Sequence, residues 1–353
     1  MIFMTKNTDS DIQQVVIKNK SENLHNQLKH GLNLENMSKS EKTRKRYLSA
    51  WKLFENYCNH YNFTYLPANF EVIYAFLSYM HDSTKSEDIY LSDADINQYS
   101  LNSIMVAKAA IEYYHKKFNM VAPTNHHRIK QLIEGIRRDK TIITKSSSPI
   151  CYDDLQNIID KIDTNLLQGL RDKAMMLLAF SGGFRPSEVI SLEISDINIE
   201  EKGLKVTINS SKTDQTNKGH TLAIPFNKNP EYCPIKSLQE WLNKTGITTG
   251  PLFRGFYKGY KKVRLTSITY QAFYDIVKSR LNDADYPTSL YSPHGFRGGF
   301  NTDAANSGAS LFKMREITKQ SLQTQQRYIK EVNLFQENAT EAIFKKKNSS
   351  NKN

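Results

Sequence analysis

The chain has 353 residues, and its 48 Lys and Arg against 36 Asp and Glu give a formal net charge of +12. Hydrophobic residues make up 39% and charged residues 24%, a globular composition that excludes collagen-like, coiled-coil-only and fully disordered proteins. No apolar run approaches the roughly 20 residues of a membrane helix, and the start of the chain lacks the apolar core of a signal peptide, so we expect a soluble, cytoplasmic protein.

The first half of the chain predicts a polar extension followed by a helical domain. Residues 1–37 are rich in Asn, Gln and Lys and allow only a weak helix. Ser40 is placed to cap a helix whose apolar face carries Trp51 and Phe54, which favours a core role over base stacking. Further helices are expected over 70–80, 101–118 and 126–138, with an acidic loop at 83–100. Residues 38–140 therefore predict an all-helical bundle.

The second half predicts a linker and a mixed domain. Residues 141–149 end in a polar Ser-Ser-Ser-Pro run, which is typical of a linker. Two short β-type runs, 204–208 and 221–224, flank a polar turn, and a polar tail at 346–353 is expected to be disordered. The fold class is thus mostly α with a small antiparallel sheet, a helical bundle followed by an α+β domain over 150–345. Helices are expected over 152–162, 171–180, 187–192, 235–243, 268–282, 294–306, 310–317 and 322–332.

Four basic residues and one tyrosine stand out by their sequence context. Arg185 follows a Gly-Gly turn and precedes Pro186, a residue that favours the first turn of a helix. His294 and Arg297 are three apart on one expected helix and therefore share a face. The other two are Lys212, on the polar turn between the strands, and Tyr328, on the last expected helix.

These residue types suit chemistry on a phosphodiester. Its transition state gains charge on the phosphate oxygens, so cations held in fixed positions are the main way to stabilise it. The planar guanidinium of arginine binds such oxygens through two parallel hydrogen bonds. A tyrosine phenol with a pKa near 10 becomes a useful nucleophile only beside such cations. A lysine on a turn can protonate a leaving oxygen. The basic surplus fits a nucleic-acid binder, although a solvated basic surface would give it too.

The order and surroundings of these residues resemble the tyrosine recombinase (phage integrase) superfamily, including its Xer-like members. The resemblance covers roughly residues 38–345, and Glu188 resembles the acidic partner that braces the first arginine. The usual His or Trp, nine residues before the tyrosine, is Lys319 here, a flexible cation that can still donate a hydrogen bond to a phosphate oxygen. The positions that match the Arg, Lys, His-x-x-Arg and Tyr pattern are Arg185, Lys212, His294, Arg297 and Tyr328.

The resemblance implies a core-DNA-binding domain at 38–140 and a catalytic domain at 150–345 that hold duplex DNA. It implies that Tyr328 attacks a phosphodiester, leaving a 3′-phosphotyrosyl link and a 5′-hydroxyl protonated by Lys212. The two arginines hold the non-bridging oxygens, and His294 assists. The reaction needs no metal or nucleotide cofactor, passes through a Holliday junction, and uses a homo-tetramer on a specific recombination site, with possible accessory proteins. The candidate DNA contacts of the first domain are Lys42, Arg44, Lys45 and Arg46.

Several alternatives stay open at this point. A type IB topoisomerase shares the chemistry but relaxes a single duplex, whereas a catalytically weakened relic, suggested by Lys319, would bind DNA without forming an adduct. A metal-dependent transposase would need a carboxylate triad, for which the sequence offers no convincing context. Lys218 lies on the same turn as Lys212, but the Ser-Lys-Thr-Asp context of Lys212 resembles the family's hairpin and favours it. The spacing from Ser321 favours Tyr328 over Tyr291 as the nucleophile. The His126-His127 pair lacks further ligands in context, so no metal site is expected.

Overall fold

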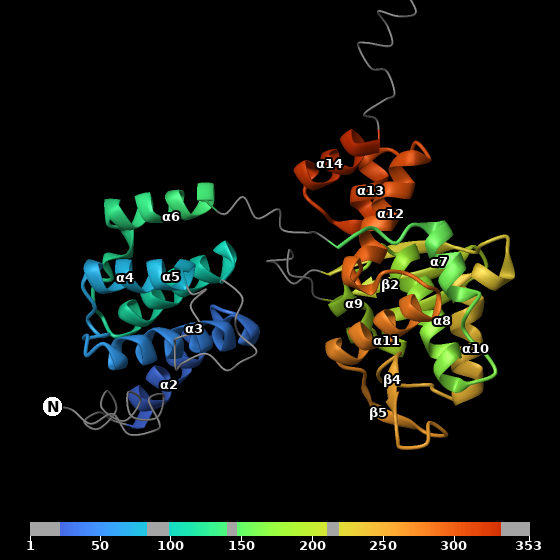
Figure 1. Cartoon of the computed structure of the whole chain (residues 1–353). Helices are drawn as coiled ribbons and strands as arrows, with labels where there is room; N and C mark the ends of the chain where they lie inside the picture. The colour runs from blue at the N-terminus through green and yellow to red at the C-terminus, as the bar shows by residue number, and fades with distance from the viewer. Residues whose placement is uncertain (1–21, 83–98, 140–146, 210–218, 333–353) are drawn as a thin grey trace, which may run out of the picture. The chain divides into compact units, whose positions relative to one another are not determined.

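The computed structural model describes residues 22–82, 99–139, 147–209 and 219–332. The chain divides into two compact units, Met1–Ile143 and Thr144–Asn353, and Figure 1 shows the elements of each. The predicted fold class, mostly helical with little antiparallel sheet, is confirmed. The loop expected at 83–100, most of the linker, Lys212 and the tail fall wholly or largely outside the described residues. Within the described ranges, no helix is long and apolar enough to cross a membrane.

Unit 1 is a bundle of helices with an aromatic core. Ser40 caps α3 by accepting a hydrogen bond from the backbone N–H of Thr43, as the sequence predicts. Trp51 and Phe54 are buried, which confirms their assignment to the core. Beside them the buried His115 ring contacts the Ile111 carbonyl at 2.8 Å, and burial lowers its pKa. The helices are α2 (Glu22–Met37), α3 (Glu41–His60), α4 (Phe70–Asp82), α5 (Leu101–Lys117) and α6 (His127–Asp139).

Unit 2 is built around α8, whose residues are buried from Gly169 to Phe180. This helix packs against α7, α9, α10 and α12, and α12 to α14 lie at one end of the unit (Figure 1). The helices, in chain order, are α7 (Tyr152–Ile159), α8 (Leu167–Ser181), α9 (Pro186–Ser191), α10 (Pro234–Thr245), α11 (Tyr270–Asp283), α12 (His294–Asn306), α13 (Leu311–Thr318) and α14 (Leu322–Val332).

The strands of unit 2 form two antiparallel sheets. The first has the order β1-β2-β3, and its register pairs Ile208 with His220 at the ends that flank residues 210–218. The second is the pair β4-β5. The sequence predicted only the central runs of β2 and β3 and missed the other three strands. The bounds are β1 (Ile197–Glu200), β2 (Gly203–Ile208), β3 (His220–Pro225), β4 (Arg254–Phe256) and β5 (Val263–Ser267).

Glycines of α12 let the chain segment that enters unit 2 pass close to this helix. The backbone N–H of Ile150 donates to the carbonyl of Gly295 at 2.9 Å. A Cβ atom on Gly299 would lie 1.8 Å from the carbonyl oxygen of Ile150, and one on Gly295 would lie 2.7 Å from that of Ser148. Side chains at these two positions would therefore force the entering segment away from α12.

Candidate active site

One pocket of unit 2 gathers most of the predicted site residues. Its volume is about 600 Å³, and polar residues of the α13–α14 connection, among them Gln320 and Ser321, complete its wall. Lys212 lies outside the described residues, and Glu188 does not line the pocket but pairs with the first arginine. The predicted residues that line the pocket are Arg185, His294, Arg297, Lys319 and Tyr328.

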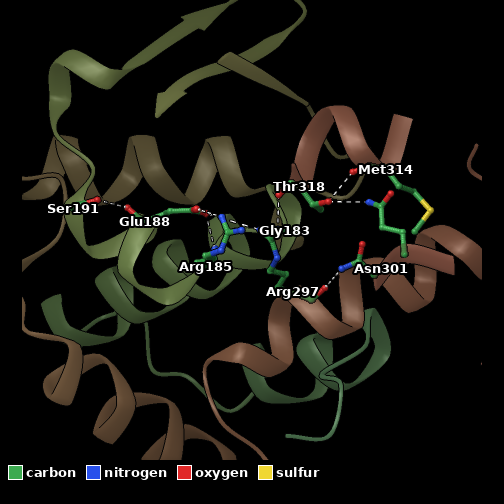
Figure 2. Close-up of polar contacts among 9 residues, drawn as sticks. Gly183, Arg185, Glu188, Ser191, Arg297, Asn301, Met314 and Thr318 are labelled. Carbon is green, nitrogen blue, oxygen red and sulfur yellow. Dashed lines mark hydrogen bonds and ion pairs between the residues drawn. The ribbon is translucent and has the colours of Figure 1, made fainter. Parts of the chain in front are cut away.

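Arg185 is fixed by the carboxylate that the sequence paired with it. It stands at the N-cap of α9, with Pro186 at the first helical position. Its backbone N–H donates to Glu188 Oε2 at 2.8 Å, and its guanidinium Nη1 donates to Glu188 Oε1 at 2.5 Å (Figure 2). The carboxylate is only 6% exposed. A charge-assisted pair of this kind in a shielded place holds the arginine in one orientation.

Arg297 is the more deeply placed cation and is held by backbone carbonyls. It is 4% exposed, and its two terminal nitrogens donate to the carbonyl oxygens of Gly183, at 2.6 Å, and of Thr318 (Figure 2). Burial, followed by the charge of Arg185, lowers the pKa of Arg297 to about 10. It therefore stays protonated at neutral pH, and two cations face the same pocket. Because a guanidinium has five N–H donors, these two bonds leave it able to bind an anion.

Gly183 supplies one of these carbonyls from a conformation that favours glycine. Its φ is +52°, and a Cβ atom there would lie 2.8 Å from Phe300 and 2.9 Å from Thr318. We expect Gly183→Ala to lower the free energy of unfolding by about 2–4 kcal/mol, the sum of a left-handed backbone cost and crowding. Denaturant unfolding measures this loss. Gly246→Ala is the matched control, because φ is +66° there and no atom lies within 4 Å of its Cβ position. Equal losses in both variants would show that crowding at Gly183 adds nothing.

The remaining pocket residues come from three different helices. His294 is exposed at the start of α12. Lys319 ends α13 in the left-handed conformation with φ 51°, and its backbone N–H donates to the carbonyl of Arg315 at 2.9 Å. Tyr328 is half-buried on α14, and its hydroxyl oxygen is 3.9 Å from where a Cβ atom on Gly298 of α12 would lie. The structure thus brings together residues that are up to 143 positions apart, from Arg185 to Tyr328.

His220 is a neighbour of the site that the sequence interpretation missed. It opens β3 and donates a ring hydrogen bond to the carbonyl of Ile317, in the last turn of α13. Burial lowers its pKa, and the nearby charges of Lys319 and Arg185 lower it further, whereas Glu188 opposes them. The ring is therefore a neutral donor at neutral pH. The only sequence signal was its place two residues after the segment 210–218, which contains Lys212.

The basic candidates of unit 1 occupy the first two turns of α3. Lys42, Lys45 and Arg46 are exposed, while Arg44 is half-buried. Lys45 forms an exposed ion pair with Glu41 at 2.6 Å, an interaction of little energetic value.

The structure gives His126 a packing contact. Its ring stacks on Phe70 with 3.9 Å between the ring centroids. Among the residues that the structure describes, no group of three His, Cys, Asp or Glu side chains is arranged to hold a metal ion.

Comparison with known sequences identifies the relatives of the chain. Residues 150–333 match the profile of the phage integrase family. A protein of Selenomonas ruminantium named integrase/recombinase xerD homolog is 30% identical over 310 residues, which cover 88% of this chain and 87% of that protein. The tyrosine recombinase XerD of Listeria monocytogenes is 26% identical over 165 residues, covering 47% of this chain and 51% of that protein.

Solved structures share the fold at low sequence identity. The XerH site-specific recombinase bound to palindromic difH substrate aligns with a TM-score of 0.53 and 17% identity, covering 76% of this chain and 72% of that one. A lambda integrase dimer bound to a COC′ core site aligns with a TM-score of 0.51 and 12% identity, covering 91% of this chain and 85% of that one.

Proposed function

Because the chain belongs to the phage integrase family of tyrosine recombinases, enzymes of site-specific DNA recombination, we propose that it cleaves and rejoins duplex DNA through a 3′-phosphotyrosyl intermediate. The observation that supports this most is the shared pocket of Arg185, Arg297 and Tyr328. It combines a nucleophile with two fixed cations, which is what attack on a phosphodiester requires.

In the proposed reaction, the hydroxyl of Tyr328 releases its proton to solvent as its oxygen attacks the phosphorus atom, and the bond to the 5′ oxygen breaks. Arg185 and Arg297 hold the non-bridging oxygens, where charge develops. Lys212 protonates the leaving 5′ oxygen, so that a 5′-hydroxyl is released. His294 assists proton transfer or phosphate binding, and Lys319 donates a further hydrogen bond. The covalent link conserves the energy of the broken bond, so the scheme requires neither ATP nor a metal ion.

The 5′-hydroxyl of a partner strand then attacks the phosphotyrosyl link, and strand exchange proceeds through a Holliday junction. Two duplexes require four active sites, so we propose a homo-tetramer on DNA that carries a specific recombination site, with or without accessory proteins. We also propose that the protein acts in the cytoplasm, as expected for a recombinase that must reach such DNA. The solved relatives named above are bound to DNA sites, which supports duplex DNA as the partner. In unit 1, the cations Lys42, Lys45 and Arg46 are exposed for contact with phosphates.

Trapping the covalent intermediate tests the proposed function. The protein is incubated with DNA fragments of its source genome, the reaction is stopped with denaturant, and the attached DNA is sequenced. We expect an adduct in the presence of EDTA, at one recurring sequence, with a free 5′-hydroxyl at the break. DNA binding without any adduct would instead support the non-catalytic relic. Relaxation of a single supercoiled plasmid without such a sequence would support the topoisomerase.

The turn that carries Lys212 offers a prediction of its own. Lys212→Ala is expected to slow cleavage of an ordinary phosphodiester by about 10²-fold, because the leaving 5′ oxygen loses its proton donor. A substrate with sulfur in place of that oxygen should be cleaved at nearly the wild-type rate, because a thiol with a pKa near 8.5 leaves without a proton. Lys218→Ala on the same turn is the control and should behave as wild type with both substrates. If Lys218→Ala slows cleavage of the ordinary substrate while Lys212→Ala does not, Lys218 is the proton donor.

A further inference from the structure

The last turn of α13 accepts hydrogen bonds from three other elements. The carbonyl of Ile317 accepts one from His220 of β3. The carbonyl of Thr318 accepts one from Arg297 of α12, and its hydroxyl accepts one from Gln325 of α14 at 2.9 Å. The last carbonyls of a helix have no partner within the helix, so donors from outside fix this turn. Figure 2 shows the hydrogen bond from Arg297 to Thr318 and, on the other side of Thr318, its hydrogen bond to Met314.

Gln325 belongs to the helix that carries the tyrosine. It lies three residues before Tyr328, so the two side chains leave α14 from neighbouring positions on one face. Gln325 is 0% exposed and Thr318 is 1% exposed. The Thr318 hydroxyl donates in turn to the carbonyl of Met314 at 2.9 Å, which orients its lone pairs toward the amide N–H of Gln325. Two α-helices are thus joined by a directed, solvent-shielded polar contact.

Packing alone does not account for a glutamine at this place. Its Oε1 atom is buried and has no hydrogen-bond partner among the residues that the structure describes. Burial of a polar atom in this state costs free energy, so a Met or Leu side chain would serve stability at least as well. What an apolar side chain lacks is the bond to Thr318, which fixes where α14 sits along α13.

We propose that Gln325 is a positioning residue for the nucleophile: its hydrogen bond to Thr318 ties the helix of Tyr328 to the turn that also binds Arg297 and ends in Lys319. This inference rests on the proposed function of the pocket. Thr318 is the shared point, because its side chain holds the nucleophile helix while its carbonyl holds the phosphate-binding arginine. The phenol oxygen and the guanidinium are therefore set relative to each other, and a displacement of about 1 Å can cost 10²-fold in rate.

Single-turnover cleavage of a duplex carrying the recombination site tests this role. Gln325→Met keeps the length and burial of the side chain but cannot bond Thr318, and Thr318→Val removes the acceptor. We expect each to slow adduct formation by at least about tenfold, with DNA affinity close to wild type. The melting temperature should stay close to wild type in Gln325→Met and fall in Thr318→Val, because Thr318→Val leaves the buried amide N–H of Gln325 without an acceptor. Thr318→Ser retains the hydroxyl and should restore the rate. Gln326→Met, an exposed neighbour on the same helix, is the matched control and should cleave normally.

The double variant separates positioning from general loosening. If both residues act through one hydrogen bond, Thr318→Val with Gln325→Met should be no slower than the slower single variant. Additive losses, or a Gln325→Met rate within twofold of wild type, would overturn the inference. A lower fraction of active protein at an unchanged rate would assign Gln325 a purely structural role. If Gln325→Met does not fold, the comparison of Thr318→Val with Thr318→Ser decides. Failure of the wild type to form any adduct would contradict the proposed function itself.

Discussion

Tyr328→Phe is expected to abolish the covalent protein–DNA adduct, with cleavage reduced by at least about 10⁴-fold, as is typical when a nucleophile is removed. The substitution deletes one hydroxyl group from a half-buried ring, so the fold and the affinity for DNA should be unchanged. Denaturing gels with end-labelled DNA measure the adduct, and a gel-shift titration measures binding.

Tyr291→Phe is the control for this experiment. Tyr291 is also half-buried, and burial raises the pKa of its phenol, which makes it a poorer nucleophile. Tyr291 is not among the residues that line the pocket. We expect the Tyr291 variant to form the adduct at the wild-type rate. An adduct that persists in Tyr328→Phe and disappears in Tyr291→Phe would identify Tyr291 as the nucleophile.

Arg297→Lys is expected to lower the cleavage rate by about 10³-fold, the upper end of the effect of removing one transition-state donor. Lysine keeps the charge, but one ammonium group cannot span the carbonyls of Gly183 and Thr318 and also bind a phosphate with the fork of a guanidinium. Single-turnover cleavage at saturating protein separates this loss from any change in DNA affinity.

Arg280→Lys controls for the general effect of losing a guanidinium in unit 2. Arg280 donates to the buried carboxylate of Asp172 at 2.8 Å and to Asp283 at 3.1 Å, and it does not line the pocket. We expect this variant to lose stability in denaturant unfolding while the fraction that remains folded cleaves at the wild-type rate. Equal rate losses in both variants would mean that Arg297 acts through the fold and not on the phosphate.

Local sequence patterns predicted the helices of this fold better than its strands. The bounds of α12 and α14 agree with the expected 294–306 and 322–332, because apolar spacing and turn residues mark both ends. In contrast, α8 begins at Leu167, four residues before its predicted start. β1 has four residues and only two apolar ones, too few for a periodic signal, and β4 has three residues with a central glycine. Their pairing depends on partners elsewhere in the chain, which one segment cannot reveal.

The candidate site was predictable from the types of its side chains, but the backbone groups that orient these side chains were not. The residue pattern led to Arg185, His294, Arg297 and Tyr328, which the structure brings into one pocket. The atoms that orient Arg297 are main-chain carbonyls, and any residue type offers a carbonyl. The bond from Gln325 to Thr318 likewise joins two common polar residues whose proximity exists only in the folded chain. Contacts of these two kinds therefore cannot be recognised from a sequence motif.

The glycine-lined passage between α12 and residues 148–151 also has a mechanical meaning. The main chain that arrives from unit 1 is bonded directly to the helix that carries His294 and Arg297, with the Ile150 N–H on the carbonyl of Gly295. A shift of residues 148–151 is therefore transmitted first to the helix that carries two of the candidate site side chains.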